Sequence, residues 1–253
     1  MCRIDLNSDL GESFGNYSLG MDQEVIQYVS SANIACGWHA GDPMVMDRTV
    51  QMAVEHGIGI GAHPGFPDLM GFGRRNMVIT PEEAKNYIIY QVGALAAFAA
   101  AHGAKLQHVK THGALYNMAA KDYKLARAMC EGVAAVDPNL IVLGLANSEW
   151  TNAGKDVGVD IRNEIFADRA YQDDGTLVPR SQPGAVIHDK NLAIQRAVGM
   201  VKSRKVTTIS GKEISISPDS MCVHGDNIMA VEFVREIRSV FAQNGIQIMR
   251  MDA

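Results

Sequence analysis

Residues 33–43 of the chain read Asn33-Ile34-Ala35-Cys36-Gly37-Trp38-His39-Ala40-Gly41-Asp42-Pro43. The run before the first glycine is short and mostly apolar, which is typical of a strand buried in a sheet. The closing Asp-Pro pair is typical of a helix start, because aspartate caps unpaired N–H groups and proline fits the first helical turn. Gly57 supplies a stop for that helix. This stretch therefore predicts a strand, a polar turn that carries a histidine, and a helix.

The same order of strand, polar turn and helix recurs along the whole chain. We expect strands at Ile4–Asn7, Asn33–Cys36, Gly57–Ala62, Gln107–Lys110, Leu140–Leu145, Ile161–Phe166 and Met221–Val223, with a weaker run at Ile246–Met249. These runs are too apolar to alternate, as expected for parallel strands covered on both faces. Further helix starts are expected at Thr80, Asp122 and Asp189, a final helix at 228–244, and a short hairpin at 205–216.

Seven strong strands in 253 residues give about 36 residues per unit, against about 31 in an eight-stranded barrel. We therefore predict an α/β fold, an incomplete seven-stranded (β/α) TIM-like barrel, with a doubly wound open sheet as the competing arrangement. No linker or change of composition divides the chain, so residues 1–253 are expected to form a single domain. Two long connections, 64–80 and 166–186, are typical of functional loops.

Composition excludes several classes of protein. With 47% hydrophobic and 20% charged residues, the chain is neither disordered nor a coiled coil. The net charge is −5, and the densest basic group is only Lys202, Arg204 and Lys205, so no nucleic-acid partner is expected. No apolar run is long enough for a secretory signal or a membrane span. We expect a cytoplasmic protein with reduced cysteines.

Polar side chains collect directly after the expected strands. In a parallel barrel the carboxyl ends of all strands open on one face, so these side chains are expected to converge there. Four histidines that have a glycine or proline within two positions, and four acids, have such positions: His39, His63, His112, His224, Asp9, Glu12, Asp42 and Asp226. For Asp42, helix capping is an equal alternative. The remaining histidines, His56, His102, His108 and His188, are expected to be structural.

Imidazoles and carboxylates on one rim suit two kinds of chemistry. One is general acid–base attack of water on an amide. The other is a divalent metal site, which here would use Asp9, His39 and His63, although no HExxH or CxxC spacing is present. Lys110 is expected to stabilise a developing oxyanion or to bind a carboxylate or phosphate. Arg74 or Arg75 is expected to bind a carboxylate or phosphate, with a solvated surface pair as an equal alternative. The sequence contains no P-loop.

Seven motifs together resemble the LamB/YcsF family over almost the whole chain. They are Asp5-Leu6-Asn7-Ser8-Asp9-Leu10-Gly11-Glu12, residues 33–42, Gly61-Ala62-His63-Pro64-Gly65-Phe66-Pro67-Asp68, Phe72-Gly73-Arg74-Arg75, Lys110-Thr111-His112-Gly113-Ala114-Leu115-Tyr116-Asn117, Glu164-Ile165-Phe166-Ala167-Asp168-Arg169-Ala170-Tyr171 and Val223-His224-Gly225-Asp226-Asn227. One departure is Thr111, where the family usually has proline.

The resemblance implies a barrel of the glycoside hydrolase/deacetylase type and the A component of a bacterial 5-oxoprolinase. That enzyme opens the cyclic amide of 5-oxo-L-proline to L-glutamate with ATP as co-substrate, together with subunits B and C. The alternatives are a metal-dependent deacetylase-like hydrolase or a non-catalytic substrate-binding subunit, and homo-oligomerisation stays open. We expect catalytic roles for Asp9, Glu12, His39, His63, Lys110, His112 and Asp226, and substrate binding by Asn7, Asp42, Arg74, Arg75, Tyr116, Asn117, Arg169 and His224.

Overall fold

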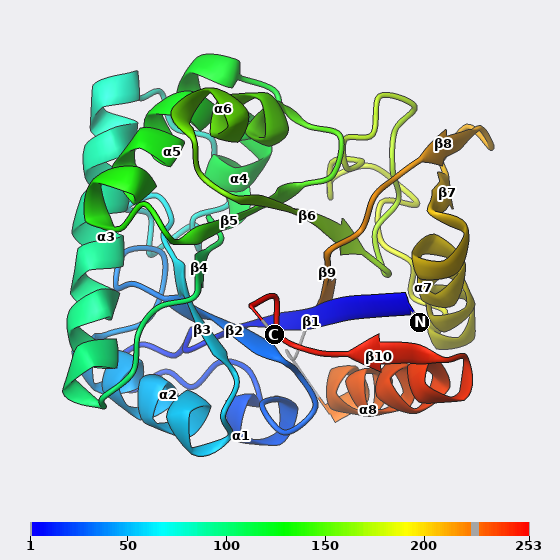
Figure 1. Ribbon diagram of the computed structural model, residues 1–253, viewed down its shortest axis with the longest axis horizontal. Helices are drawn as coiled ribbons and strands as arrows, with labels where there is room; N and C mark the ends of the chain where they lie inside the picture. Colours follow the sequence, from blue (N-terminus) through cyan, green and yellow to red (C-terminus); the bar gives the residue numbers. More distant parts are fainter. Residues whose placement is uncertain (1, 224–227, 253) are drawn as a thin grey trace.

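The barrel at the centre of the molecule is a closed ring of seven parallel strands. A computed structural model describes residues 2–223 and 228–252. The ring strands are β1 (Cys2–Leu10), β2 (Ser31–Ala35), β3 (Gly59–His63), β4 (His108–Val109), β5 (Ile141–Leu145), β6 (Ile161–Phe166) and β9 (Ser220–Val223). Each pairs with the next in this order, and β9 returns to β1 (Figure 1). The predicted seven-stranded (β/α) barrel is confirmed, and the open-sheet alternative is wrong.

Helices surround the ring and connect its strands. They are α1 (Asp22–Val25), α2 (Pro43–Glu55), α3 (Pro81–Ala101), α4 (Gly113–Ala119), α5 (Tyr123–Val136), α6 (Glu149–Val157), α7 (Lys190–Ser203) and α8 (Ile228–Gln243). The predicted starts of α2, α3, α5 and α7 are confirmed, because the side chain before each accepts from backbone N–H groups of the first turn. The helices α1, α4 and α6 were not predicted; none has a side-chain cap that would announce it.

Three short strands lie outside the ring. The predicted hairpin is present as β7 (Lys205–Thr207) and β8 (Glu213–Ser215), which pair antiparallel. The weak run at the end forms β10 (Ile246–Ile248), which pairs with the first residues of β1. Because β1 is longer than predicted, it borders β10 with its start and β2 and β9 with the rest.

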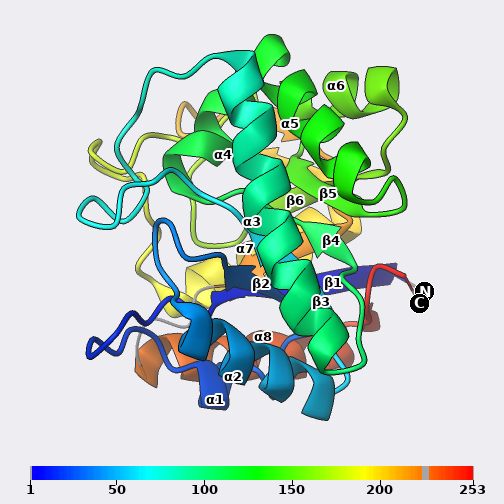
Figure 2. The same cartoon turned by 90° about the vertical axis from the view of Figure 1, so that its left-hand side faces the viewer.

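The two faces of the ring strands differ in chemistry. Side chains alternate along a strand, so Leu6 faces the helices and Asp5 and Asn7 face the inside of the barrel. The inside is polar near its centre, where most barrels have branched aliphatic side chains. In Figure 2 the connections that follow the strands project to the left, and both termini lie on the right. Among the described residues, no helix is long and apolar enough to cross a membrane.

Candidate functional site

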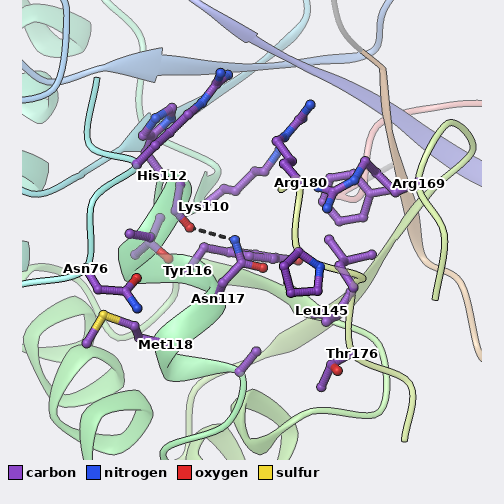
Figure 3. Close-up of a pocket in the computed structure, with 18 of the residues that line it drawn as sticks. Asn76, Lys110, His112, Tyr116, Asn117, Met118, Leu145, Arg169, Thr176 and Arg180 are labelled. Carbon is purple, nitrogen blue, oxygen red and sulfur yellow. Dashed lines mark hydrogen bonds between the residues drawn. The ribbon is translucent and has the colours of Figure 1, made fainter. Parts of the chain in front are cut away.

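A pocket of about 450 Å³ opens at the carboxyl ends of the strands. Its floor contains Asp9, Glu12, His63, Lys110 and His112, and its walls include Arg74, Tyr116, Asn117, Arg169 and Arg180. Figure 3 shows Lys110, His112, Tyr116 and Arg180 around this cavity. The predicted convergence of strand-end residues on one face is therefore present for these side chains.

Three histidines and Glu12 form a tight cluster on one side of the floor. His39 Nε2 lies 3.1 Å from Glu12 Oε1, and His112 Nδ1 lies 3.4 Å from the same oxygen. His63 Nε2 is 3.0 Å from His112 Nδ1. The rings of His39 and His112 are stacked, with centres 3.7 Å apart and planes within 5°. Close glycines allow this packing, because a Cβ on Gly65 would press against the His39 ring, and one on Gly73 against the His39 Cβ and the His112 ring.

The hydrogen bonds around His63 require both of its ring nitrogens to be donors. Nδ1 lies 2.6 Å from the Lys110 carbonyl oxygen, which can only accept. His112 Nε2 donates to the Phe72 carbonyl oxygen at 2.8 Å, so a neutral His112 presents a bare Nδ1 to His63 Nε2. His63 Nε2 also faces Asp9 Oδ2 at 3.4 Å. The arrangement therefore fits a protonated His63 between a carboxylate and a neutral histidine.

A buried group of charges lies next to this cluster. Lys110 Nζ is 2.8 Å from Asp9 Oδ1 and 2.9 Å from Glu164 Oε1, and it also donates to Asn7 Oδ1 and Cys222 Sγ. The side chains of Lys110 and Glu164 are 4% and 0% exposed. Such charges are stable in a barrel interior only when each faces an opposite charge. Lys110 and His63 therefore serve as the counter-ions of Asp9 and Glu164.

Burial and neighbouring charges set the protonation of the site. Burial would raise the pKa of Asp9, but His63 and Lys110 hold that pKa well below its usual range. Burial would lower the pKa of His63, but the Asp9 carboxylate raises it above its ordinary value. The pKa values of His39 and His112 are lowered well below the usual range, mainly by burial. The pKa of Lys110 is raised by Asp9, against the effect of burial. The Asp9 carboxylate therefore favours the charged forms of His63 and Lys110, while burial favours the neutral forms of His39 and His112.

Part of the pocket wall is cationic. Arg74 and Arg180 both line it, and the Arg74 guanidinium lies over the Phe72 ring at 4.9 Å. Arg169 is also a wall residue, but two of its nitrogens donate to the carbonyl oxygens of Val178 and Ala185. Arg169 therefore fixes the long loop after β6, and Arg74 and Arg180 are better placed for an anionic ligand.

Several predicted site residues have other positions. Asp42 does not line the pocket; it caps α2, accepting from Met44 N and Val45 N, so the local capping role prevails. Arg75 also lies outside the pocket lining and forms an ion pair with Asp68. Asn7 is fully buried below the floor, where it contacts Lys110. The prediction for these three as substrate-binding residues is therefore not supported. Two further candidates, His224 and Asp226, lie outside the described residues.

Three residues of the site, Glu164, Cys222 and Arg180, were not predicted from the sequence. Glu164 could have been recognised, because it is the one acidic residue in the strand Ile161–Phe166 and is followed directly by two apolar residues. Nothing in the sequence distinguishes Arg180, which reaches the pocket because the loop between β6 and α7 folds back over it. Cys222 is buried 3.1 Å from Lys110 Nζ, and burial raises the pKa of its thiol well above the usual range.

The histidine cluster also has partial metal-site geometry. Glu12, His39, His63 and His112 each offer an atom within 4.8 Å of the others, and imidazole with carboxylate is a donor set that suits zinc. Zn–N bonds of about 2.1 Å at tetrahedral angles would put two ring centres about 5 Å apart. The stacked rings of His39 and His112 are closer and parallel. In this arrangement at most Glu12, His63 and one of the other two histidines fit a common ion.

Fold and site together define a seven-stranded (β/α) barrel with a histidine–carboxylate–lysine centre at the carboxyl ends of its strands. The sequence profile of the LamB/YcsF family matches residues 4–253, and the chain belongs to that family.

Similar proteins cover the chain from end to end. The A component of the 5-oxoprolinase of Alkaliphilus metalliredigens is 61% identical over 253 residues, 100% of this chain and 99% of the relative. The corresponding 5-oxoprolinase component of Pyrococcus abyssi is 56% identical over 247 residues, 98% of this chain and 97% of that protein. The crystal structure of the lactam utilization protein from Thermus thermophilus superposes with a TM-score of 0.92 at 43% identity, covering 98% of this chain and 99% of the other.

Proposed function

We propose that this chain is the ring-opening subunit of a cytoplasmic, ATP-dependent 5-oxoprolinase, which hydrolyses the cyclic amide of 5-oxo-L-proline to L-glutamate. The observation that carries the proposal is the convergence of Glu12, His63, His112 and Lys110 on one pocket floor. The relatives named as the A component of 5-oxoprolinase, which match nearly full length, support the choice of substrate.

The pocket supplies both proton transfers that hydrolysis of an amide needs. A water oxygen bonds to the lactam carbonyl carbon and loses a proton to Glu12, the carboxylate beside the neutral histidines. The carbon–nitrogen bond then breaks, and the ring nitrogen takes a proton from the protonated His63. Asp9 is a poor base, because its pKa is held low by His63 and Lys110. We therefore assign Asp9 to keeping those two groups charged.

The cationic groups account for the charges of the reaction. Lys110 lies at the pocket floor and is positively charged, so it stabilises the negative charge that develops on the carbonyl oxygen. Arg74 and Arg180 on the wall suit the carboxylate of 5-oxoproline. A pocket of about 450 Å³ leaves room beside this small ring, which fits a substrate that carries an added activating group.

ATP supplies the driving force, because a five-membered lactam is an unreactive amide. Transfer of a phosphoryl group from ATP to the carbonyl oxygen would activate the carbonyl carbon toward water. Cleavage of the carbon–nitrogen bond would then leave an acyl phosphate of glutamate, and hydrolysis of that phosphate to glutamate and inorganic phosphate would make the opening irreversible. The sequence has no P-loop, and the described pocket is built from acid–base side chains. We therefore place the nucleotide on the partner subunits B and C, and the hydrolytic step on this chain.

Asp9→Asn and His112→Ala test the location of the site. Each variant is expected to lower ATP-dependent glutamate formation by about 10²-fold or more, because each removes one of the two side chains that contact His63 Nε2. Turnover is measured after mixing the chain with subunits B and C, and folding is checked by circular dichroism. His102→Ala is the matched control, because His102 pairs with Asp47 on the outer surface. Full turnover by both folded site variants, with 5-oxoproline still bound, would instead support a non-catalytic substrate-binding subunit.

The pH profile tests the assignment of His63 as the acid. Since the Asp9 charge raises the pKa of His63, kcat/KM is expected to fall only at pH values above the ordinary histidine range. In Asp9→Asn the raising effect of the carboxylate is gone and burial lowers the pKa of His63. The fall in kcat/KM with rising pH therefore moves to lower pH. The residual kcat/KM of the variant between pH 5 and 9, compared with wild type, measures this shift. A fall at an unchanged pH would assign the proton to another group.

A metal-dependent hydrolase is the second candidate, favoured by the four ligand atoms within 4.8 Å of one another. In that case Glu12, His63 and one further histidine would hold the ion, which would lower the pKa of bound water. We expect the purified chain to hold substoichiometric zinc and nickel by elemental analysis. Stoichiometric metal that is lost in His63→Ala, but retained in His102→Ala, would favour the metal-dependent reaction.

A further inference from the structure

Below the pocket floor, the barrel interior contains a row of buried, hydrogen-bonded polar side chains that the proposed reaction does not use directly. Asn33 and His108 are both 0% exposed, and neither lines the pocket. A barrel interior is usually filled with branched aliphatic side chains. Burying an amide and an imidazole costs stability unless every polar atom is satisfied, so such groups need a reason to be there.

The contacts of Asn33 fix the orientation of its amide. Its Nδ2 donates to Asp9 Oδ1 at 2.8 Å and to Asn7 Oδ1 at 2.7 Å. Both partners are oxygens, so the nitrogen must point toward them and Oδ1 must point away. Asn33 Oδ1 then faces His108 Nε2, which lies 2.7 Å away and donates to it. His108 thus holds the amide in the one orientation that offers a donor to Asp9.

The strand register shows that this contact is built into the sheet. Asp9 is paired with Asn33, Asn33 with Gly61, and Gly61 with His108, across four adjacent strands. His108 therefore reaches Asn33 over the intervening strand β3. It can do so only because residue 61 has no side chain, since a Cβ there would overlap the imidazole. The other ring nitrogen of His108, Nδ1, lies 3.1 Å from Gln107 Oε1.

We propose that His108 and Asn33 are positioning residues for the reaction, which hold the Asp9 carboxylate in the rotamer that contacts both Lys110 and His63. Asp9 Oδ1 receives Lys110 Nζ and Asn33 Nδ2, while Oδ2 is left for His63. Without the donor from Asn33, the carboxylate can rotate about its last bond and the two cations lose their common partner. This inference rests on the proposed function, because it concerns the reaction assigned to this pocket.

The test replaces His108 with phenylalanine, which keeps the ring volume and removes the donor. In the reconstituted enzyme, kcat is expected to fall about 10- to 100-fold, since small misplacements of reacting groups have effects of that size. KM for 5-oxoproline is expected to change little, because Arg74 and Arg180 are untouched. His108→Gln retains a donor and is expected to recover most of kcat. His102→Phe, on the outer surface, is the matched control and is expected to match wild type.

A double-variant cycle separates positioning from general damage to the core. If His108 acts through Asn33, adding His108→Phe to Asn33→Ala lowers kcat no further, whereas independent structural effects would multiply. Wild-type kcat in folded His108→Phe, or a full additional loss in the double variant, would overturn the proposal. Should His108→Phe fail to fold, kcat of Asn33→Ala and of His108→Gln decides in its place: loss in the first with retention in the second supports positioning, and any other result overturns it. Undiminished turnover by Asp9→Asn would instead contradict the proposed function itself.

Discussion

Lys110→Met is expected to lose turnover and to destabilise the barrel in one step. The ammonium lies 2.8 Å from Asp9 Oδ1 and 2.9 Å from Glu164 Oε1, and the lysine side chain is 4% exposed. Removing it leaves two buried carboxylates without their shared ammonium, and breaking a buried pair in this way typically costs about 3–5 kcal/mol. Turnover is expected to fall by about 10²–10³-fold or more, because the developing oxyanion loses its cation. Urea unfolding and the reconstituted assay measure the two effects.

A second substitution separates these effects. In Lys110→Met with Glu164→Gln, one of the two uncompensated charges is removed, so the free energy of unfolding is expected to recover in part while turnover stays low. Lys85→Met is the matched control, because Lys85 pairs with Glu131 at the surface, where ion pairs contribute little. Normal turnover by folded Lys110→Met would exclude the proposed oxyanion role.

Glu12→Gln is expected to reduce kcat by about 10²–10⁴-fold with little change in stability. Glutamine has the shape of glutamate and keeps an oxygen to accept from His39 Nε2, but it cannot take a proton from water. The expected signature is therefore a low kcat, a KM for 5-oxoproline near that of wild type and an unchanged unfolding curve.

The control for this variant is Glu24→Gln, an exposed acid in the first turn of α1. It is expected to match wild type in both kcat and stability. If Glu12→Gln turned over at the rate of wild type, the base would have to be Asp9 or Asp226, the other two acids for which the sequence predicts a catalytic role.

The sequence alone was enough for the ring of strands and for the side chains at its carboxyl ends. His39, His63 and His112 follow strands directly, so a parallel barrel must bring them to one rim. Local signals could not choose between the two roles of Asp42, or between Arg74 and Arg75. That choice depends on which way a long loop turns, and the loop is fixed by contacts far away in the sequence.

The row of hydrogen-bonded polar side chains inside the barrel could not be predicted from one sequence. His108 was expected to be structural because it lies at a strand entry, and its contact with Asn33 depends on the register of three neighbouring strands. Glu164 likewise meets Lys110 only because β4 and β6 lie on either side of β5 in the ring. Such pairs follow from the order and register of neighbouring strands, which periodicity within a single strand does not describe.

The way in which the ring closes also determines when the barrel can complete its folding during synthesis. Closure pairs Asp5 on β1 with Ser220 on β9, positions 215 apart along the chain. Contacts between residues so far apart in the sequence are slow to form. Here they cannot form on the ribosome until nearly all of the polypeptide has emerged. Until then, one edge of β1 remains an open template for strand pairing. Truncated chains that stop before β9 are therefore expected to aggregate rather than to fold into a smaller barrel.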